Sequence, residues 1–556
     1  MKRVSPSLPW VVGALLLCLL VCLPLTFILY ESSKPSTEAW QQLSQVDPGG
    51  ILEELDLKEE IPEHSRLYLK TKNTLLLLCS VVALSAMAGI ALAWVVSRWH
   101  FPLRKSMSVC LVLPLTIPSY ILAASYKLLT IDTKNSLAVW VRTNWGQDVM
   151  STFDELWNFT LATFVLTAAF FPYVYLAART AFSNLSTSYL ESSQSLGLSS
   201  SQTFLKVALP LARPAIIGGL MLVSLETLNE FGAMKILGID TLTTEIFYAW
   251  TNLEDKNAAI RLAGCIMLIL LVLLIAEQWL SGGKRFHASR NTSSSPTLKK
   301  IPKFKSALVT LSCLTILFLA FILPVGQLIN LAVDGLEKDS ISRFLPLVAN
   351  SLWLAANSSV LILFASVFLA YACRKIPHWS MVTLSKVSTL GYAIPGAILG
   401  ICTIAVIGFI KNNTSGGNLL DYLYYGSSYG LVLAYLVRFL AVGLPPIDAG
   451  LKQINRNLDE ASQCLGHGFL STFFRLHLPL LKLSLSAGAI MLFIDILKEL
   501  PLTLILNPSN HETLATKTYS LFAVEERYTT GAIPALILIL AGIMGLCAVR
   551  YISRNK

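Results

Sequence analysis

Long apolar runs separated by short polar segments recur along the whole chain. Runs close to the roughly 20 residues that cross a bilayer as a helix include Trp10–Tyr30, Thr74–Val96, Ala307–Ile329 and Ile533–Val549. We count about twelve such runs. Of the 556 residues, 54% are hydrophobic and only 14% are charged, and the mean hydropathy is +0.62. The pattern predicts an all-α polytopic membrane protein, since a soluble domain has about 25% charged residues.

The placement of the charges indicates a membrane protein and argues against nucleic acid as a partner, although the net charge is +10. Lys and Arg cluster in alternate loops, as they do in cytoplasmic segments of membrane proteins. The clusters are Lys2 and Arg3; Arg98, Arg104 and Lys105; Lys284, Arg285, Arg290, Lys299, Lys300, Lys303 and Lys305; Arg374 and Lys375; and Arg550, Arg554 and Lys556. We therefore expect a multi-pass protein of the bacterial inner membrane, surrounded by lipid, with both termini cytoplasmic and the acidic loop Glu53–Glu60 outside.

The N-terminal run and the cysteines fit this topology. No small-x-small cleavage site follows the apolar stretch, because Pro24 is followed by bulky Leu25 and Phe27, so we expect an uncleaved first span. Most of the ten cysteines lie in apolar runs, and Cys373 and Cys464 lie on the predicted inner side. We expect no disulfide bond and no thiolate metal site.

The chain repeats itself once. The segment Glu191–Gly197 aligns with Glu460–Gly466 at an offset of 269 residues. Further matches are Leu209–Leu211 with Leu478–Leu480 at the same offset, Asn73 with Asn350 and Pro118 with Pro395 at an offset of 277, and Thr241–Thr244 with Thr513–Thr516. The duplication therefore covers most of the chain.

Each half contains about six spans, which fits two parallel halves related by a pseudo-two-fold axis along the membrane normal. We expect residues 1–70 to hold a first span and an outer loop, and residues 71–280 to form a first transmembrane domain. Residues 281–305, with a Gly-Gly pair and a Ser/Thr-rich stretch, are typical of a cytoplasmic linker. Residues 306–349 then hold the seventh span and a loop, and residues 350–551 form a second domain. A pathway between the halves follows from this arrangement.

The repeated segments Glu191–Gly197 and Glu460–Gly466 lie between spans on the basic side, so we expect both in the cytoplasm. In the first, Tyr189–Leu196 favours one helix, the glycine permits a turn with positive φ, and Ser199–Val207 favours a second helix before Pro210. A minimal connection uses far fewer residues, so we interpret both as docking segments for a partner. An idle amphipathic loop on the membrane is the alternative for a single copy, and the second copy disfavours it.

The sequence contains no phosphate-binding loop of the form Gly-x4-Gly-Lys-Ser/Thr. The nearest stretch, Gly282-Gly283-Lys284-Arg285, has neither the spacing nor the hydroxyl. If ATP drives this protein, a partner must hydrolyse it.

The docking segments resemble the cytoplasmic loop of the transmembrane subunits of type I ABC importers, which reads Glu-Ala-Ala-x3-Gly-x9-Ile-x-Leu-Pro. The first copy lacks both alanines of that motif and the second lacks one. The resemblance implies the permease fold of that family, no catalytic residues, no cofactor, two copies of an ATPase subunit and a periplasmic binding protein. It implies that coupling to the ATPase rests on Glu191, Gly197, Pro210, Glu460, Gly466 and Pro479.

The segments that follow the docking segments, Glu226–Trp250 and Asp495–Leu506 continuing to Thr516, resemble ferric iron permeases. This resemblance spans nearly the whole chain and implies uptake of iron(III) from the binding protein. Thiamine, a polyamine or an oxyanion stays an alternative cargo, because fused halves also occur for those substrates. A membrane enzyme or an ion-coupled secondary transporter is a further alternative, but no cluster of nucleophiles or metal motif supports the first, and the second needs no docking segment.

Two acidic pairs occupy equivalent positions in the repeat, and each is spaced by four residues, which predicts one helix face for each pair. The pairs are Glu226 with Glu230 and Asp495 with Glu499. Carboxylates at membrane depth are costly unless they line a cavity or a pathway, and hard cations favour oxygen ligands. We expect the four to line the pathway. The alternative is a polar cluster at a helix end, because Lys498 neighbours the second pair.

Pro118 and Pro395 match in the repeat and are expected to break their spans where these line the pathway. A kink that serves packing alone is the alternative. The histidines show no spacing typical of a metal cage, so we expect no stable metal site.

Overall fold

The computed structural model describes residues 8–35, 37–44, 65–146, 149–185, 187–281, 298–336, 341–413, 429–507 and 512–554. Within these residues, ten helices are long and apolar enough to cross a membrane, and the number rises to twelve if each of two bent helix pairs is one span. The predicted all-α polytopic fold with about twelve membrane helices is therefore confirmed.

In the described residues of the first half, the regular elements are all helical apart from one two-residue strand. Its elements are α1 (Leu8–Ser32), α2 (Glu38–Ser44), α4 (Arg66–Arg98), β1 (Trp99–His100), α5 (Arg104–Cys110), η2 (Leu113–Thr116), α6 (Ser119–Trp145), α7 (Met150–Asn184), α8 (Thr187–Ser195), α9 (Ser200–Thr203), η3 (Phe204–Ala208), α10 (Leu209–Asn229), α11 (Gly232–Leu237), α12 (Leu242–Thr251) and α13 (Lys256–Ser281).

The second half follows in the same order. Its elements are β2 (Lys299–Lys300), α14 (Lys303–Leu317), η4 (Phe318–Ile322), α15 (Leu323–Leu336), η5 (Ile341–Phe344), α16 (Leu345–Lys375), α17 (Trp379–Ser388), η6 (Leu390–Ala393), α18 (Gly396–Asn413), α20 (Tyr429–Gln453), α21 (Arg456–Cys464), α22 (Phe469–Thr472), η8 (Phe473–His477), α23 (Leu478–Leu497), α24 (Pro501–Leu506), α25 (Leu514–Ala523) and α26 (Tyr528–Arg554).

The register of the sequence repeat is reproduced in the element boundaries. At an offset of 269 residues, α8, α9, η3 and α11 begin and end at the positions of α21, α22, η8 and α24. At an offset of 277, η2 matches η6 and the start of α6 matches the start of α18. The same local sequence pattern thus folds the same way twice, as expected for parallel repeats.

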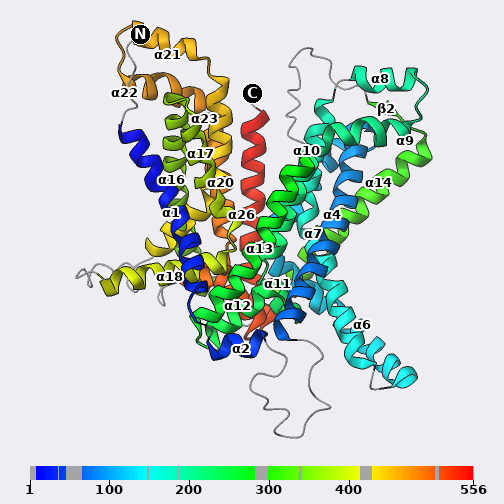
Figure 1. Ribbon diagram of the computed structural model, residues 1–556. Helices are drawn as coiled ribbons and strands as arrows, with labels where there is room; N and C mark the ends of the chain where they lie inside the picture. Colours follow the sequence, from blue (N-terminus) through cyan, green and yellow to red (C-terminus); the bar gives the residue numbers. More distant parts are fainter. Residues whose placement is uncertain are drawn as a thin grey trace.

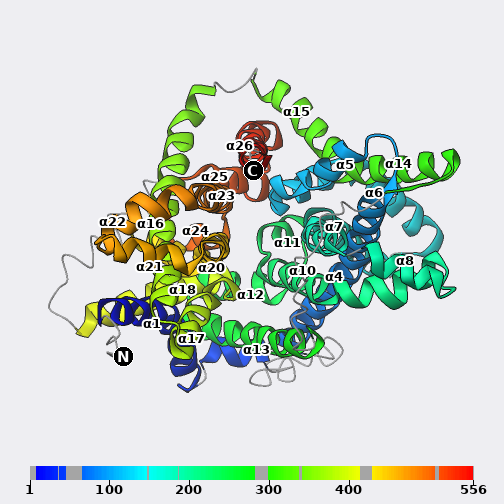
Figure 2. The ribbon, with the colours of Figure 1, turned by 90° about the horizontal axis from the view of Figure 1, so that it is seen from above.

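The two halves stand side by side and lean apart toward the end that carries α8 and α21 (Figures 1 and 2). We call this the docking end and the opposite end, where the halves converge, the far end. The first helix of each half packs on the other half. Trp10 of α1 stacks on Phe368 of α16 with ring centroids 5.0 Å apart, and Ser125 of α6 donates to the Pro324 carbonyl of α15 at 3.3 Å. Each half therefore contributes its first span to packing against the other half.

The breaks expected at Pro118 and Pro395 are confirmed. Residues Arg104–Thr116 and Ser119–Trp145 meet at 92°, and Trp379–Ala393 and Gly396–Lys411 meet at 108°. Proline lacks an N–H and disfavours a helical residue before it, so each helix ends here and a new one starts in another direction.

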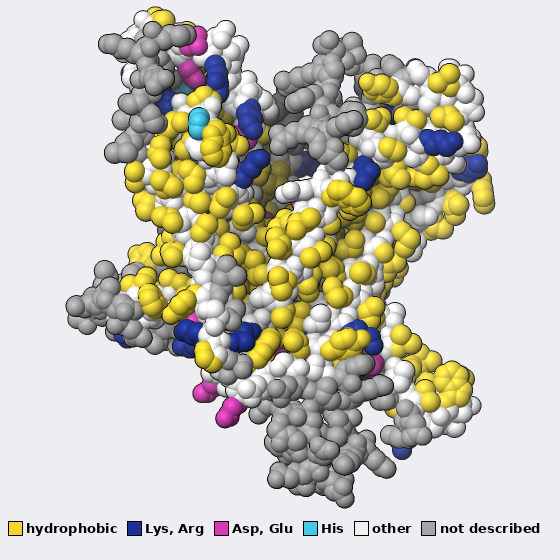
Figure 3. All heavy atoms as spheres, in the orientation of Figure 1, with side chains coloured by type: hydrophobic (Ala, Val, Ile, Leu, Met, Phe, Trp, Pro, Cys, Tyr) yellow, Lys and Arg dark blue, Asp and Glu magenta, His cyan; other side chains and the backbone are white. Residues whose placement is uncertain are grey.

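Hydrophobic side chains cover most of the middle of the face seen in Figure 3, and Lys and Arg gather above and below this belt. The only sheet among the described residues is the parallel pairing of β1 with β2, which joins the end of the interdomain linker to the first half. The domain boundaries stay predictions. Residues 282–297 of the linker and the acidic loop Glu53–Glu60 lie outside the described residues.

Candidate functional site

A small cavity of about 80 Å³ lies where the two halves converge, and we call it the central cavity. The first half lines it with Leu115, Ile117, Pro118, Ser119, Tyr120, Ala169, Phe170, Tyr173, Glu226, Asn229, Glu230 and Gly232. The second half adds Tyr392, Arg438, Phe439, Asp495, Lys498, Glu499, Leu500 and Pro501. All four carboxylates singled out in the sequence, and Pro118, line this one space, whereas Pro395 is not among its lining residues.

The expectation that each acidic pair shares one helix face is wrong. Helix α10 ends at Asn229 and α23 ends at Leu497, so Glu230 and Glu499 lie beyond the helix ends. In the second half the cause is local, because Pro501 follows two residues after Glu499 and cannot continue the helix. The chain then turns, and both members of each pair still reach the same cavity.

Glu230 and Glu499 cap the short helices that follow them. The Glu230 carboxylate accepts from Ala233 N at 2.9 Å, and Glu499 accepts from Leu502 N at 3.1 Å. The Ser119 hydroxyl, at the start of α6, also donates to Glu230. Carboxylates are stabilised at helix N-termini by unpaired N–H groups and the helix dipole. A helix-end role, the alternative left open by the sequence, thus fits these two acids.

Basic side chains reach the cavity only from the second half. Arg438 Nε lies 3.6 Å from Glu499 Oε2, and Lys498 Nζ lies 2.9 Å from Asp495 Oδ1. The repeat places Ala169 and Asn229 at the positions equivalent to Arg438 and Lys498. The acids are therefore duplicated and the bases are not, so the excess negative charge of the cavity belongs to the first half.

Glu226 differs from the other three carboxylates. It caps no helix, and among the described residues it forms no ion pair. Its Oε1 accepts a hydrogen bond from the Tyr392 hydroxyl of the other half at 2.5 Å. Three residues later, Asn229 Oδ1 accepts from Gly396 N, also across the halves, at 2.7 Å. These polar contacts tie the halves together beside the cavity, and the second carboxylate oxygen of Glu226 accepts no hydrogen bond from the described residues.

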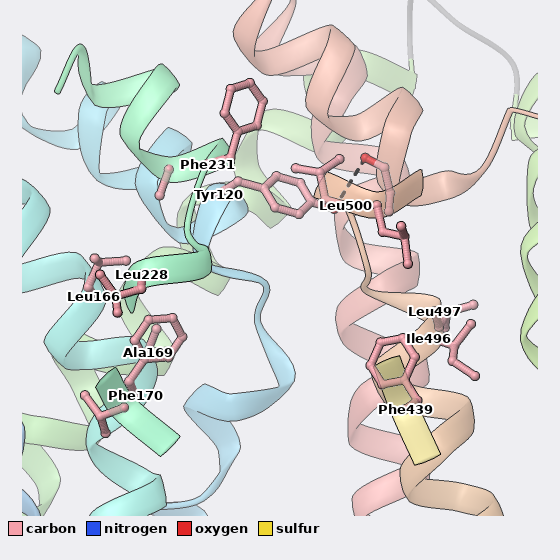
Figure 4. Close-up of a cluster of buried hydrophobic side chains, with 14 of the residues drawn as sticks. Tyr120, Leu166, Ala169, Phe170, Leu228, Phe231, Phe439, Ile496, Leu497 and Leu500 are labelled. Atoms are coloured by element: carbon pink, nitrogen blue, oxygen red, sulfur yellow. Dashed lines mark hydrogen bonds between the residues drawn. The ribbon is translucent and has the colours of Figure 1, made fainter. Parts of the chain in front are cut away.

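Aromatic and aliphatic side chains close the cavity where the halves meet. Tyr120, Phe231 and Leu500 lie together in Figure 4 and come from both halves. Tyr519 packs edge-on against Tyr120 with centroids 6.3 Å apart. A Cβ on Gly232 would lie 2.8 Å from both Leu500 and Tyr120, so only glycine allows this approach. The contact between the halves is close-packed at this level.

The docking segments form the expected helix–turn–helix. Helices α8 and α21 each end before a glycine with positive φ, +86° at Gly197 and +77° at Gly466. Glu191 and Glu460 are exposed on these helices. One expectation is wrong: the second helix of the first segment does not stop before Pro210. The π-helical turns η3 and η8 run directly into α10 and α23, and each turn lies just before the proline, whose missing N–H interrupts the regular α-helical hydrogen bonds.

Several polar residues of the cavity went unrecognised in the sequence, among them Arg438, Tyr392 and Asn229. Arg438 carried a usable signal, because a charged residue inside the apolar span Tyr429–Gln453 indicates a functional site by default. Tyr392 and Asn229 carried none, since their roles arise from contacts between the halves. Within the described residues, no three His, Cys, Asp or Glu side chains are grouped so as to hold a metal ion, and all ten cysteines are free.

The sequence matches a known family in both halves. The model of the family described as the binding-protein-dependent transport system inner membrane component matches residues 85–283 and again residues 362–556. The Fe(3+)-transport system permease protein FbpB 2 of Haemophilus influenzae is 25% identical over 84% of this chain and 87% of its own length.

Two further relatives are named for different cargoes. The ferric transport system permease protein FbpB of Actinobacillus pleuropneumoniae is 21% identical over 76% of this chain and 62% of its own length. The sulfate transport system permease protein CysT of Salmonella typhimurium is 27% identical over 50% of this chain and 92% of its own length.

Proposed function

Because the chain belongs to the family of binding-protein-dependent transport system inner membrane components, and is thus an ABC importer permease with both halves fused, we propose that its cargo is iron(III). A periplasmic binding protein delivers the ion at the far end, and two copies of an ATPase subunit bind at the docking end. The docking end and both termini are cytoplasmic in this proposal. The central cavity then lies on the pathway between the halves.

The observation that carries the proposal is the charge of the central cavity. Four carboxylates face two basic groups there, and a trivalent cation crossing a low-dielectric region needs such compensation. Hard cations take oxygen ligands, which this cavity offers as carboxylates, an amide oxygen and phenols. The ferric relatives, each aligned over three quarters or more of this chain, support the same cargo.

The four carboxylates have different tasks in this proposal. Glu226 is the one placed to meet the cargo, because it caps no helix and no base lies within ion-pair distance of it among the described residues. Glu230 and Glu499 hold the short helices α11 and α24 in place. Asp495 becomes available only when Lys498 moves away. Transport thus needs Glu226 most, and the capping acids act through the shape of the cavity.

The reconstituted system tests this directly. The chain, its ATPase subunits and its binding protein are placed in liposomes, and ATP-dependent uptake of radioactive iron(III) is measured. We expect Glu226→Gln to lower uptake by about tenfold or more, which corresponds to about 1.4 kcal/mol. Asp132→Asn, which changes an exposed carboxylate on α6 outside the cavity, is the control and keeps wild-type uptake. Unchanged uptake in all four single Gln or Asn variants of the cavity acids contradicts the pathway assignment.

An oxyanion is the second candidate cargo, since the sulfate permease relative matches half of this chain and Arg438 and Lys498 line the cavity. The same liposomes decide between the two. Uptake of radioactive sulfate, with iron(III) neither transported nor competing, refutes the ferric proposal and leaves the permease function intact.

A further inference from the structure

The second docking helix is joined to the membrane bundle by a chain of charged and polar side chains. Asp459, in the first turn of α21, accepts from Arg374 Nε at 2.9 Å and lies 2.8 Å from Arg374 Nη2. Its other oxygen accepts from His477 Nε2 at 2.5 Å. The Tyr371 hydroxyl meets the remaining ring nitrogen of His477. His477 and Arg374 are 4% and 10% exposed, so water competes little for these bonds.

This network connects α21 to two long helices of the second half that line the central cavity, α20 and α23. Arg374 Nη1 also donates to the Leu451 and Ile454 carbonyls, at 2.6 and 3.0 Å, and thereby holds the end of α20. Helix α20 carries Arg438 at the cavity. His477 immediately precedes α23, whose opposite end leads to Glu499. Any displacement of α21 is thus passed to two helices that line the cavity.

The first half has an arginine that makes the same backbone contacts, one position later in the register of the repeat, and it lacks the rest. Arg98 donates to the Phe182 and Leu185 carbonyls at 2.8 and 3.4 Å, the positions equivalent to those that Arg374 holds. The repeat puts Leu190 where the second half has its aspartate, and Ala208 where it has its histidine. Among the described residues no carboxylate pairs with Arg98, and its Nε is buried without a hydrogen bond.

Both halves share one weaker contact between the two helices of the docking segment. The hydroxyls of Ser193 and Thr203 lie 3.1 Å apart in the first half, and those of Ser462 and Thr472 lie 2.8 Å apart in the second. This contact closes the helix–turn–helix on itself and does not reach the membrane bundle. The charged network of Asp459, His477 and Arg374 is therefore present in the second half and absent from the described residues of the first, where Lys299 of the linker only donates to Ser200 at 3.4 Å.

We infer that Asp459 and His477 are positioning residues that fix the second docking helix rigidly to α16, α20 and α23, while the first docking helix is held loosely. The inference rests on the docking role proposed above. Movement of the ATPase subunits is then transmitted mainly through the second half, which carries the basic residues of the cavity. The first half, which carries the uncompensated carboxylates, follows through the contacts between the halves.

Hydrogen–deuterium exchange of the full chain in lipid nanodiscs tests the rigid attachment without any cargo or ATPase. We expect the amides of α21 to exchange more slowly than those of α8 in the wild type. The double variant Asp459→Leu with His477→Ala installs the first-half residues and raises α21 exchange by about tenfold or more, because charge-assisted hydrogen bonds are lost. Exchange in α8 and at the cavity stays unchanged. Equal exchange of α8 and α21 in the wild type, or no change in the variant, overturns the inference.

The assembled transporter tests the mechanical consequence. We expect the double variant to bind the ATPase subunits and to hydrolyse ATP, but to consume several times more ATP for each radioactive iron(III) ion transported. The conservative pair Asp459→Asn with His477→Gln keeps hydrogen bonds and restores part of the coupling. If transport and hydrolysis fall by the same factor, the network serves stability only and the inference fails. If the wild-type chain does not bind the ATPase subunits, that result contradicts the proposed function and not this inference.

Discussion

Replacing Glu499 by glutamine separates the charge of this side chain from its shape. The amide oxygen of the glutamine still accepts from Leu502 N, so the cap of α24 survives. What disappears is the negative charge opposite Arg438, which is 3% exposed. In the variant, Arg438 Nη1 still donates to the Ile394 carbonyl at 3.1 Å, whereas Arg438 Nε is buried without a hydrogen bond.

Removing one partner of a buried ion pair costs about 3–5 kcal/mol, because the remaining charge is left in a low-dielectric region. The Nε to Oε2 distance of 3.6 Å exceeds hydrogen-bond length, so the pair attracts as separated charges. We therefore expect Glu499→Gln to lower the free energy of unfolding by about 3 kcal/mol, the lower end of that range.

The repeat supplies a matched control at Glu230. Its carboxylate caps α11 in the same way, but no base pairs with it among the described residues. Glu230→Gln is thus expected to cost about 1 kcal/mol or less, the net worth of a hydrogen bond. The measurement is a denaturant titration of the purified chain in mixed micelles, followed by tryptophan fluorescence. Equal costs for the two variants would refute the ion-pair reasoning, and a stabilised Glu499→Gln would show that the pair opposes folding.

Three further predictions test packing, turn geometry and orientation. Gly391→Ala places a Cβ 2.1 Å from the Val437 carbonyl and should destabilise the chain by about 1–3 kcal/mol, whereas Gly218→Ala, with nothing within 4 Å, should be neutral in the same titration. Gly197→Ala forces an alanine to φ +86° and should weaken ATPase binding measured by co-purification, and unchanged binding would contradict the need for this turn. Cys464, exposed on α21, should react with a membrane-impermeant maleimide in inside-out vesicles only, and labelling from the opposite side would reverse the proposed orientation.

The sequence by itself determined the features that depend on local pattern. Apolar length predicted the membrane helices, the repeat predicted the register at which α8 to α12 return as α21 to α25, and the matched prolines predicted the two sharp breaks. Each of these features depends on residues close together in the chain, through side-chain hydrophobicity, the missing N–H of proline or a turn at glycine. The docking segments were found for the same reason.

Only the tertiary structure decided how the halves meet. It brought Tyr392 of the second half across to Glu226 of the first. It also packed the first span of each half on the other half, and it joined Asp459 to His477 in one half only. These contacts link residues far apart in the chain, so no local pattern encodes them. The repeat predicted where the carboxylates lie, and the fold decided which of them are paired.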